Sequence, residues 1–113
     1  MPIISTTRAD VPVIIIDQGR LTDDLGLKEL YDEIVAEVEC GKKKNVVLDF
    51  ELVETVTSPG LSMLIRAKIK FDEKGAKLHL CGLGANVAEV IRATSLSRLF
   101  PVHHDVASAL RTI

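Results

Sequence analysis

Aromatic residues and an excess of charge of one sign are both scarce in this sequence. It contains no tryptophan, one tyrosine and three phenylalanines, and its sixteen acidic and fourteen basic residues give a formal charge of −2. Stacking on aromatic rings and neutralisation of phosphates by Lys and Arg are main sources of affinity for nucleic acids. The densest basic stretch, Lys42 to Lys44, follows Gly41 and is typical of a solvated turn. Composition therefore argues against a protein that binds nucleic acid.

Cysteine and long apolar runs are also rare. Cys40 and Cys81 belong to no CxxC pair and to no cluster with histidine, so neither a disulfide scaffold nor a metal site is predicted. Cys81 lies in an apolar strand pattern, which favours a small buried residue. Runs such as Val13 to Ile16 are far shorter than the roughly 20 residues that span a bilayer. Residues 1–3 lack the features of a secretion signal, and we expect a cytoplasmic protein without membrane insertion.

A catalytic constellation is missing as well. No nucleophile, base and orienting acid stand at a recognisable spacing, so the sequence predicts no enzyme and no resident cofactor. The segment Gly82-Leu83-Gly84 follows an expected strand, but Val87 stands where a dinucleotide-binding loop would have its third glycine. Nucleotide binding at this segment is therefore the weakest of the hypotheses considered.

The three histidines predict no metal site. His103 and His104 are neighbours, and adjacent side chains on an extended segment point to opposite faces. A surface pair beside a helix that begins at Asp105 is the better interpretation. His79 stands between Leu78 and Leu80, so strand alternation places it on the opposite face from them.

Short β-branched runs alternate with apolar residues at helical spacing along the 113 residues, which suffice for one domain over 1–113. The expected strands are 3–7, 11–17, 46–48, 77–81 and 99–102, and the expected helices are 23–40, 59–73, 86–94 and 105–113. The order ββαβαβαβα predicts an α/β fold with a mixed sheet of four to five strands and four helices. Pro12 suggests an edge position for its strand.

The second helix has two expected faces and a distinctive start. Leu61, Leu64, Ile65 and Ile69 recur at helical spacing and are expected in the core, while Arg66, Lys70 and Glu73 can face water. Ser58 can serve as the N-cap, and Pro59 is favoured at the first helical position. By itself, a Ser-Pro-Gly helix start is explained by structure and requires no function.

Four segments together resemble a known family. They are Val46 to Phe50 followed by Thr57 to Leu61, Gly19 to Thr22, Lys74 to Leu78, and Leu96 to Phe100. In order and spacing they are similar to the STAS domains of anti-sigma factor antagonists, in which a central strand is followed by Asp-Ser-x-Gly-Leu at a helix start. Thr57 stands here in place of the family's aspartate, and Thr22 replaces an aspartate in the Gly-x-Leu-Asp segment.

The resemblance implies a bacterial partner-switching protein that regulates transcription. The unmodified chain would bind an anti-sigma factor serine kinase, phosphorylation of Ser58 would dissolve the complex, and a phosphatase would reset it. Thr57 is the alternative acceptor, and a non-phosphorylated STAS scaffold or subunit of a signalling or lipid-transport assembly is the alternative function. The expected partner-binding residues, together with the loop 23–26, are Asp23, Asp24, Thr57, Ser58, Pro59, Gly60, Met63, Arg66 and Lys70.

Overall fold

The computed structural model describes residues 3–17, 19–21 and 24–113. Its helices are α1 (Asp24–Glu39), α2 (Ser58–Glu73), α3 (Ala85–Ala93), α4 (Val106–Arg111) and the 3-10 turn η1 (Leu96–Arg98). The strands of the main sheet are β1 (Ile3–Arg8), β2 (Val11–Ile16), β4 (Asn45–Asp49), β6 (Lys77–Cys81) and β7 (Val102–His103). A second, two-stranded sheet consists of β3 (Arg20–Leu21) and β5 (Thr55–Val56).

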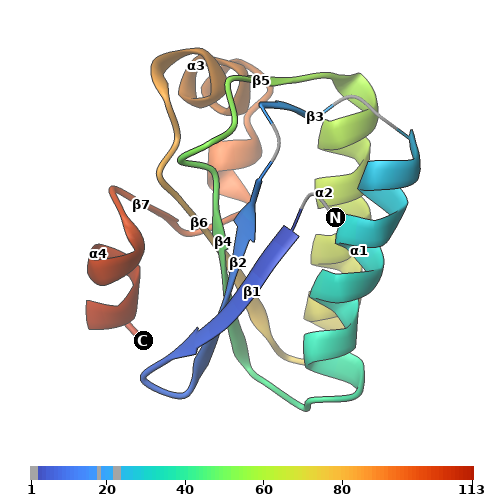
Figure 1. The fold of residues 1–113 in the computed structure, drawn as a ribbon, viewed down its shortest axis with the longest axis vertical. Coiled ribbons are helices and arrows are strands. Elements are labelled where there is room, and N and C mark those ends of the chain that lie inside the picture. The colour runs from blue at the N-terminus through green and yellow to red at the C-terminus, as the bar shows by residue number, and fades with distance from the viewer. Residues whose placement is uncertain (1–2, 18, 22–23) are drawn as a thin grey trace.

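The main sheet is mixed and has the strand order β1-β2-β4-β6-β7. The β1–β2 pair is antiparallel, and the other neighbouring strands run parallel. Helices α1 and α2 lie side by side against one face, and α4 lies on the other (Figure 1). The predicted α/β fold with a mixed sheet of four to five strands and four helices is confirmed, and the main sheet has five strands.

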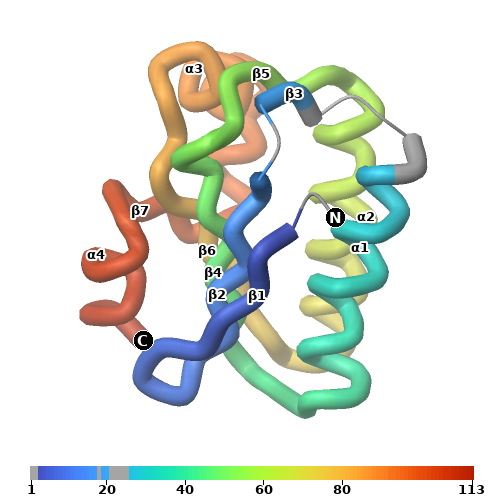
Figure 2. Tube along the Cα trace, viewed as in Figure 1, coloured from blue at the N-terminus to red at the C-terminus, as the bar shows by residue number. Residues whose placement is uncertain are grey.

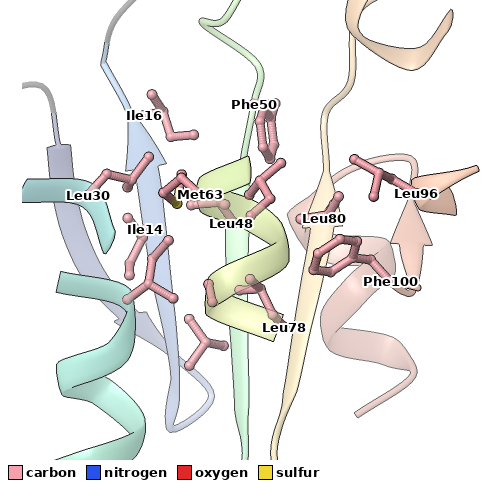
Figure 3. Packing of buried hydrophobic residues seen from close by; sticks show 14 of the residues in the cluster. Ile14, Ile16, Leu30, Leu48, Phe50, Met63, Leu78, Leu80, Leu96 and Phe100 are labelled. Atoms are coloured by element: carbon pink, nitrogen blue, oxygen red, sulfur yellow. The ribbon is translucent and has the colours of Figure 1, made fainter. Parts of the chain in front are cut away.

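Strand alternation divides the apolar residues between two clusters. Val46 and Leu48 point into the larger cluster, which α1, α2 and α3 cover, whereas Val47 belongs to a smaller cluster with Ala109 of α4. The larger cluster is drawn in Figure 3, where Leu48 and Leu80 of neighbouring strands point the same way. Because β4 is buried on both faces, its sequence is a continuous apolar run rather than an alternating one.

The hairpin between β1 and β2 turns through two residues, Ala9 and Asp10, which have φ angles of 52° and 66°. Positive φ at both central positions is the backbone of the tight hairpin turn whose twist matches that of the strands. The predicted edge position of Pro12 is wrong, because β2 lies between β1 and β4. Pairing with β4 begins at Val13, so Pro12 precedes the part of β2 with neighbours on both sides.

Three short elements were not predicted, namely β3, β5 and η1. The strands β3 and β5 pair in parallel and run side by side in Figure 2. The last strand is β7, which is shifted towards the C-terminus from the predicted residues 99–102 because η1 ends just before Leu99. Helix α3 begins after Gly84 and not at a cap on Asn86.

Candidate functional site

The segment that leads from β4 to α2 is anchored at several points. The Phe50 amide donates to the carbonyl of Cys81 over 2.9 Å, and the amides of Glu54 and Thr55 donate to the carbonyl of Gly19 over 2.7 and 3.1 Å. Phe50 is fully buried. These backbone bonds and this side chain fix the path of the chain, so the start of α2 has a defined position.

The N-cap of α2 is Thr57 and not Ser58 as the sequence predicted. Thr57 has an extended backbone, with φ −101° and ψ 175°, and its carbonyl accepts the first helical hydrogen bond, from the Leu61 amide at 3.0 Å. Ser58 is therefore the first helical residue and Pro59 the second. Proline is tolerated there because the first four helical N–H groups have no partner within the helix. Ser58 is exposed, and no hydrogen bond of its hydroxyl is found among the described residues.

The structure places the other expected contact residues in different environments. Met63 is wrong as a contact residue, because its side chain is fully buried in the main cluster, and Gly60 is buried as well. Arg66 is exposed, and Lys70 is half-exposed and lies 3.9 Å from Glu73. Asp23 lies outside the described residues. Asp24 begins α1, so the expected loop at 23–26 is largely the first turn of that helix.

A shallow depression of about 460 Å³ lies between α1 and the start of α2. It brings together Pro59, Ser62 and Arg66 of α2 with residues of α1 between Leu27 and Asp32. The Arg66 guanidinium carbon lies 5.6 Å from the centre of the Tyr31 ring, within the range of a cation–π contact. Pro59, the neighbour of Ser58, borders the depression. The depression therefore brings α1 next to the start of α2, two segments that were predicted separately as contact surfaces.

The outward face of α2 differs from the expected one. The buried residues are Gly60, Met63, Leu64, Ala67 and Phe71. Ile65 and Ile69, which were expected in the core, are 39% and 54% exposed. Each residue turns an α-helix by about 100°, so a stripe centred on Leu64, Ala67 and Phe71 leaves both isoleucines outside it.

Three hydrogen-bonded polar side chains, of which His79 is buried and Asn45 and His103 are half-buried, connect three strands on the opposite face of the sheet. His79 Nε2 lies 2.9 Å from Asn45 Oδ1, and His79 Nδ1 lies 3.0 Å from His103 Nε2. Because the Asn45 oxygen only accepts, the neutral His79 ring carries its proton on Nε2 and accepts a hydrogen bond from His103 at Nδ1. Burial, followed by His103 and Lys77, lowers the pKa of His79 to about 4.

The face predicted for His79 is confirmed, since Leu78 and Leu80 belong to the main cluster and His79 pairs in register with Val47. The prediction of a surface pair at 103–104 is wrong for His103, which is half-buried against His79, while His104 is exposed. Asp105 caps α4 by accepting from the Ser108 amide at 2.8 Å, and this bond lowers the pKa of Asp105.

The carboxyl ends of β4 and β6 meet at a second depression, of about 500 Å³. The Asp49 Oδ1 atom accepts from the Glu51 amide at 2.9 Å, and Gly82 packs against both residues with φ +69°. Burial, followed by the Asp49 carboxylate, raises the pKa of the Cys81 thiol to about 12, so Cys81 is a buried thiol as predicted. The Asp49 carboxylate beside Gly82 would repel the phosphates of a nucleotide, which argues against a nucleotide-binding loop here.

Within residues 3–17, 19–21 and 24–113, no cluster of three His, Cys, Asp or Glu side chains is arranged to hold a metal ion. None of the helices in this described part combines the length and the apolar character that a bilayer span requires.

Comparison with known proteins gives consistent results. A family model for the STAS domain matches residues 25–109. BtrV of Bordetella bronchiseptica, whose name describes it as a candidate anti-sigma factor antagonist, is 28% identical over 88 residues, or 75% of each chain. An anti-sigma factor antagonist from Mycobacterium paratuberculosis has the same fold, with a TM-score of 0.83 at 22% identity, covering 98% of this chain and 92% of that one. The phosphorylated form of the Bacillus cell fate determinant SpoIIAA also has a similar fold, with a TM-score of 0.73 at 13% identity, covering 98% of this chain and 99% of that one.

Proposed function

Because the chain belongs to the STAS domain family, we propose that it is a partner-switching protein of the anti-sigma factor antagonist type. In the bacterial cytoplasm, the unmodified chain binds an anti-sigma factor serine kinase. The kinase phosphorylates Ser58, the modified chain is released, and a phosphatase restores the unmodified form. The chain performs no chemistry of its own, and the kinase brings the ATP.

The exposed hydroxyl of Ser58 at the first position of a capped helix is the observation that supports this proposal most directly. Thr57 fills the cap position, so the helix does not depend on the Ser58 side chain. The hydroxyl is therefore free to enter the active site of a kinase, and its modification removes no interaction that holds α2 in place. Thr57 is only half-exposed, which makes it the less accessible acceptor.

A phosphate at Ser58 changes the surface without opposing the fold. It adds a charge of about −1.5 to −2 at a helix N-terminus, where the free N–H groups and the helix dipole favour an anion. The helix is therefore expected to keep its structure on phosphorylation. The effect falls on the partner, because the new charge and bulk must be accommodated in a packed interface.

The adjoining depression between α1 and α2 supplies a surface for that interface. Pro59 and Arg66 both border it, so a partner that reaches Ser58 also meets α1. The contact surface proposed for the partner thus consists of the first two turns of α2, the depression and the exposed side of α1.

The acceptor is tested by incubating the chain with the anti-sigma factor kinase of the same genome and ATP, and locating phosphate by mass spectrometry. Ser58→Ala and Thr57→Val serve as matched variants that each remove one hydroxyl. We expect phosphate on the parent chain and on Thr57→Val, and none on Ser58→Ala. Phosphate confined to Thr57 would overturn the assignment, and a chain that binds the kinase but is never modified would support the scaffold alternative.

A further inference from the structure

Strand β7 and helix α4, at the C-terminal end, are held to the rest of the chain by few interactions. The two residues of β7 pair in register with β6 at Leu80–Val102 and Cys81–His103. Helix α4 has six residues and stands apart from the other helices in Figure 1. Segments with short strands and little buried apolar surface open at a lower free energy than the core of a protein.

The apolar contacts of α4 are confined to the smaller cluster. Ala109 is its buried residue, and Val106 and Leu110 are partly buried against the same cluster. Phe100, in contrast, is buried in the main cluster. The main core therefore anchors the chain as far as Phe100, and a hinge after this residue lets the following segment leave the sheet without opening that core. We call residues 101–113 the C-terminal flap.

The side chain of His103 fastens the flap to the sheet. His103 Nε2 donates to His79 Nδ1 over 3.0 Å, and His79 Nε2 donates to Asn45 Oδ1 of β4 over 2.9 Å. The first of these bonds joins the flap to β6, whereas the second lies within the sheet. With the flap in place, His79 is only 4% exposed. Opening of the flap therefore breaks one hydrogen bond of His79 and admits water to its ring.

The surroundings of His79 oppose its protonation while the flap is closed. Burial, followed by the charges of His103 and Lys77, lowers the pKa of His79 from 6.5 to about 4. None of the other titratable groups described on the flanking elements forms an ion pair with His79; they are Asp49 of β4, Cys81 of β6, His104 and Asp105 after β7, and Arg111 of α4. Because water reaches the ring in the open flap, opening is coupled to the uptake of a proton.

We propose that the C-terminal flap opens as a unit while the rest of the chain stays folded, and that the bond between His103 and His79 is a latch released when His79 takes up a proton. Opening leaves the main cluster closed and uncovers the smaller one, whose sheet residues include Val13 and Val47. The device is separate from the proposed switch at Ser58, because α2 lies on the other face of the sheet (Figure 1).

Amide hydrogen exchange distinguishes opening of the flap from unfolding of the whole chain. The amides of Leu80 and Gly82 donate to flap carbonyls over 2.9 and 3.2 Å, whereas the Phe50 amide donates to the carbonyl of Cys81 over 2.9 Å, between β4 and β6. At pH 7 we expect Leu80 and Gly82 to be at least about tenfold less protected than Phe50 and to depend far less on added urea, because a small opening exposes little surface. Equal protection and equal urea dependence at all three amides would show that no flap opens.

The latch is tested by measuring the same protection factors, which exclude the direct effect of pH on exchange, from pH 7 to pH 5. His79 takes up a proton near pH 6.5 once water reaches it and near pH 4 in the closed flap, so the opening equilibrium should rise about twentyfold over this range. Asp105 remains ionised throughout, since the bond from Ser108 lowers its pKa. The protection of Leu80 and Gly82 should fall by that factor, and protection that does not vary with pH would overturn the latch.

Two matched variants test the bond itself at pH 7. His103→Val removes the group that donates to His79, and His104→Val makes the same substitution at the neighbouring exposed residue. Loss of one hydrogen bond should lower the protection of Leu80 and Gly82 about fivefold in His103→Val, while His104→Val should exchange like the parent. Equal protection in the two variants would refute the role of His103. If His103→Val does not fold, the urea and pH dependence of the parent still decide.

Discussion

Acid should weaken the fold through His79. In the folded chain, protonation of Nδ1 would place its new N–H against the Nε2–H of His103, in a site where His79 is only 4% exposed. The pKa of His79 is lowered to about 4 from 6.5, so the unfolded chain binds this proton more readily. Stability from this group is therefore complete above pH 6.5 and is lost as the pH falls towards 4.

The size of the effect follows from that difference. Each pH unit between the two values changes the free energy of unfolding by up to 1.36 kcal/mol per proton, which gives about 3 kcal/mol in total. Urea denaturation from pH 7 to pH 4 measures it. His79→Gln should be less stable at pH 7, because it disturbs the bonds to Asn45 and His103, but its stability should vary less with pH.

His104→Gln is the matched control, because it removes an exposed imidazole and leaves the hydrogen bonds of His79 to Asn45 and His103 intact. This variant should keep the pH dependence of the parent. Carboxylates such as Asp105 also contribute to acid unfolding, so the difference between parent and variant slopes is the informative quantity. Equal slopes in the parent and in His79→Gln would refute the reasoning.

Two further predictions concern the glycine turns and the basic residues of α2. Gly82→Ala should lower the free energy of unfolding in urea by about 2 kcal/mol or more, because the added Cβ would lie 2.7 Å from Asp49 Oδ1 at φ +69°. Gly75→Ala is the control, since its φ is +67° but the space around it is open, and it should cost only about 1 kcal/mol. Equal losses in the two variants would contradict the predicted steric overlap with Asp49. Arg66→Glu should weaken kinase binding in calorimetry and lower the free energy of unfolding by about 0.5–1 kcal/mol through loss of the contact with the Tyr31 ring. An unchanged affinity after reversing both Arg66 and Lys70 would place the interface elsewhere.

Patterns of several residues made most of the fold predictable. The apolar run at 46–48 and the helical spacing from Leu27 to Val38 each repeat a signal over their length, and both elements form where expected. The strands β3 and β5 have two residues each, too few for any period to be detected. Two side chains of α2 were assigned to the wrong face, because Ile65 and Ile69 look like core residues in the sequence, whereas Leu64 is buried and Arg66 is exposed as expected. Exposed isoleucines become visible only when Met63, Ala67 and Phe71 are seen to fill the core.

The candidate site was predictable in place but not in detail. Ser58 and Thr57 both have the chemistry of an N-cap, and Pro59 is tolerated at the first or the second helical position, so local rules could not choose between them. The bonds of His79 to Asn45 and His103 depend on the register of β4, β6 and β7, which no single segment encodes. Because Thr57 is the cap, Ser58→Ala should lower the free energy of unfolding by less than the roughly 1 kcal/mol that loss of an N-cap side chain costs.

The central claim is that phosphate at Ser58 switches partner binding. Calorimetry with the anti-sigma factor kinase compares the unmodified chain with chain phosphorylated at Ser58, under identical conditions without nucleotide. Burying the added charge in a packed interface should cost about 3 kcal/mol, so phosphorylation should weaken binding about a hundredfold while both forms remain equally folded. Equal affinity of the two forms would contradict the switch.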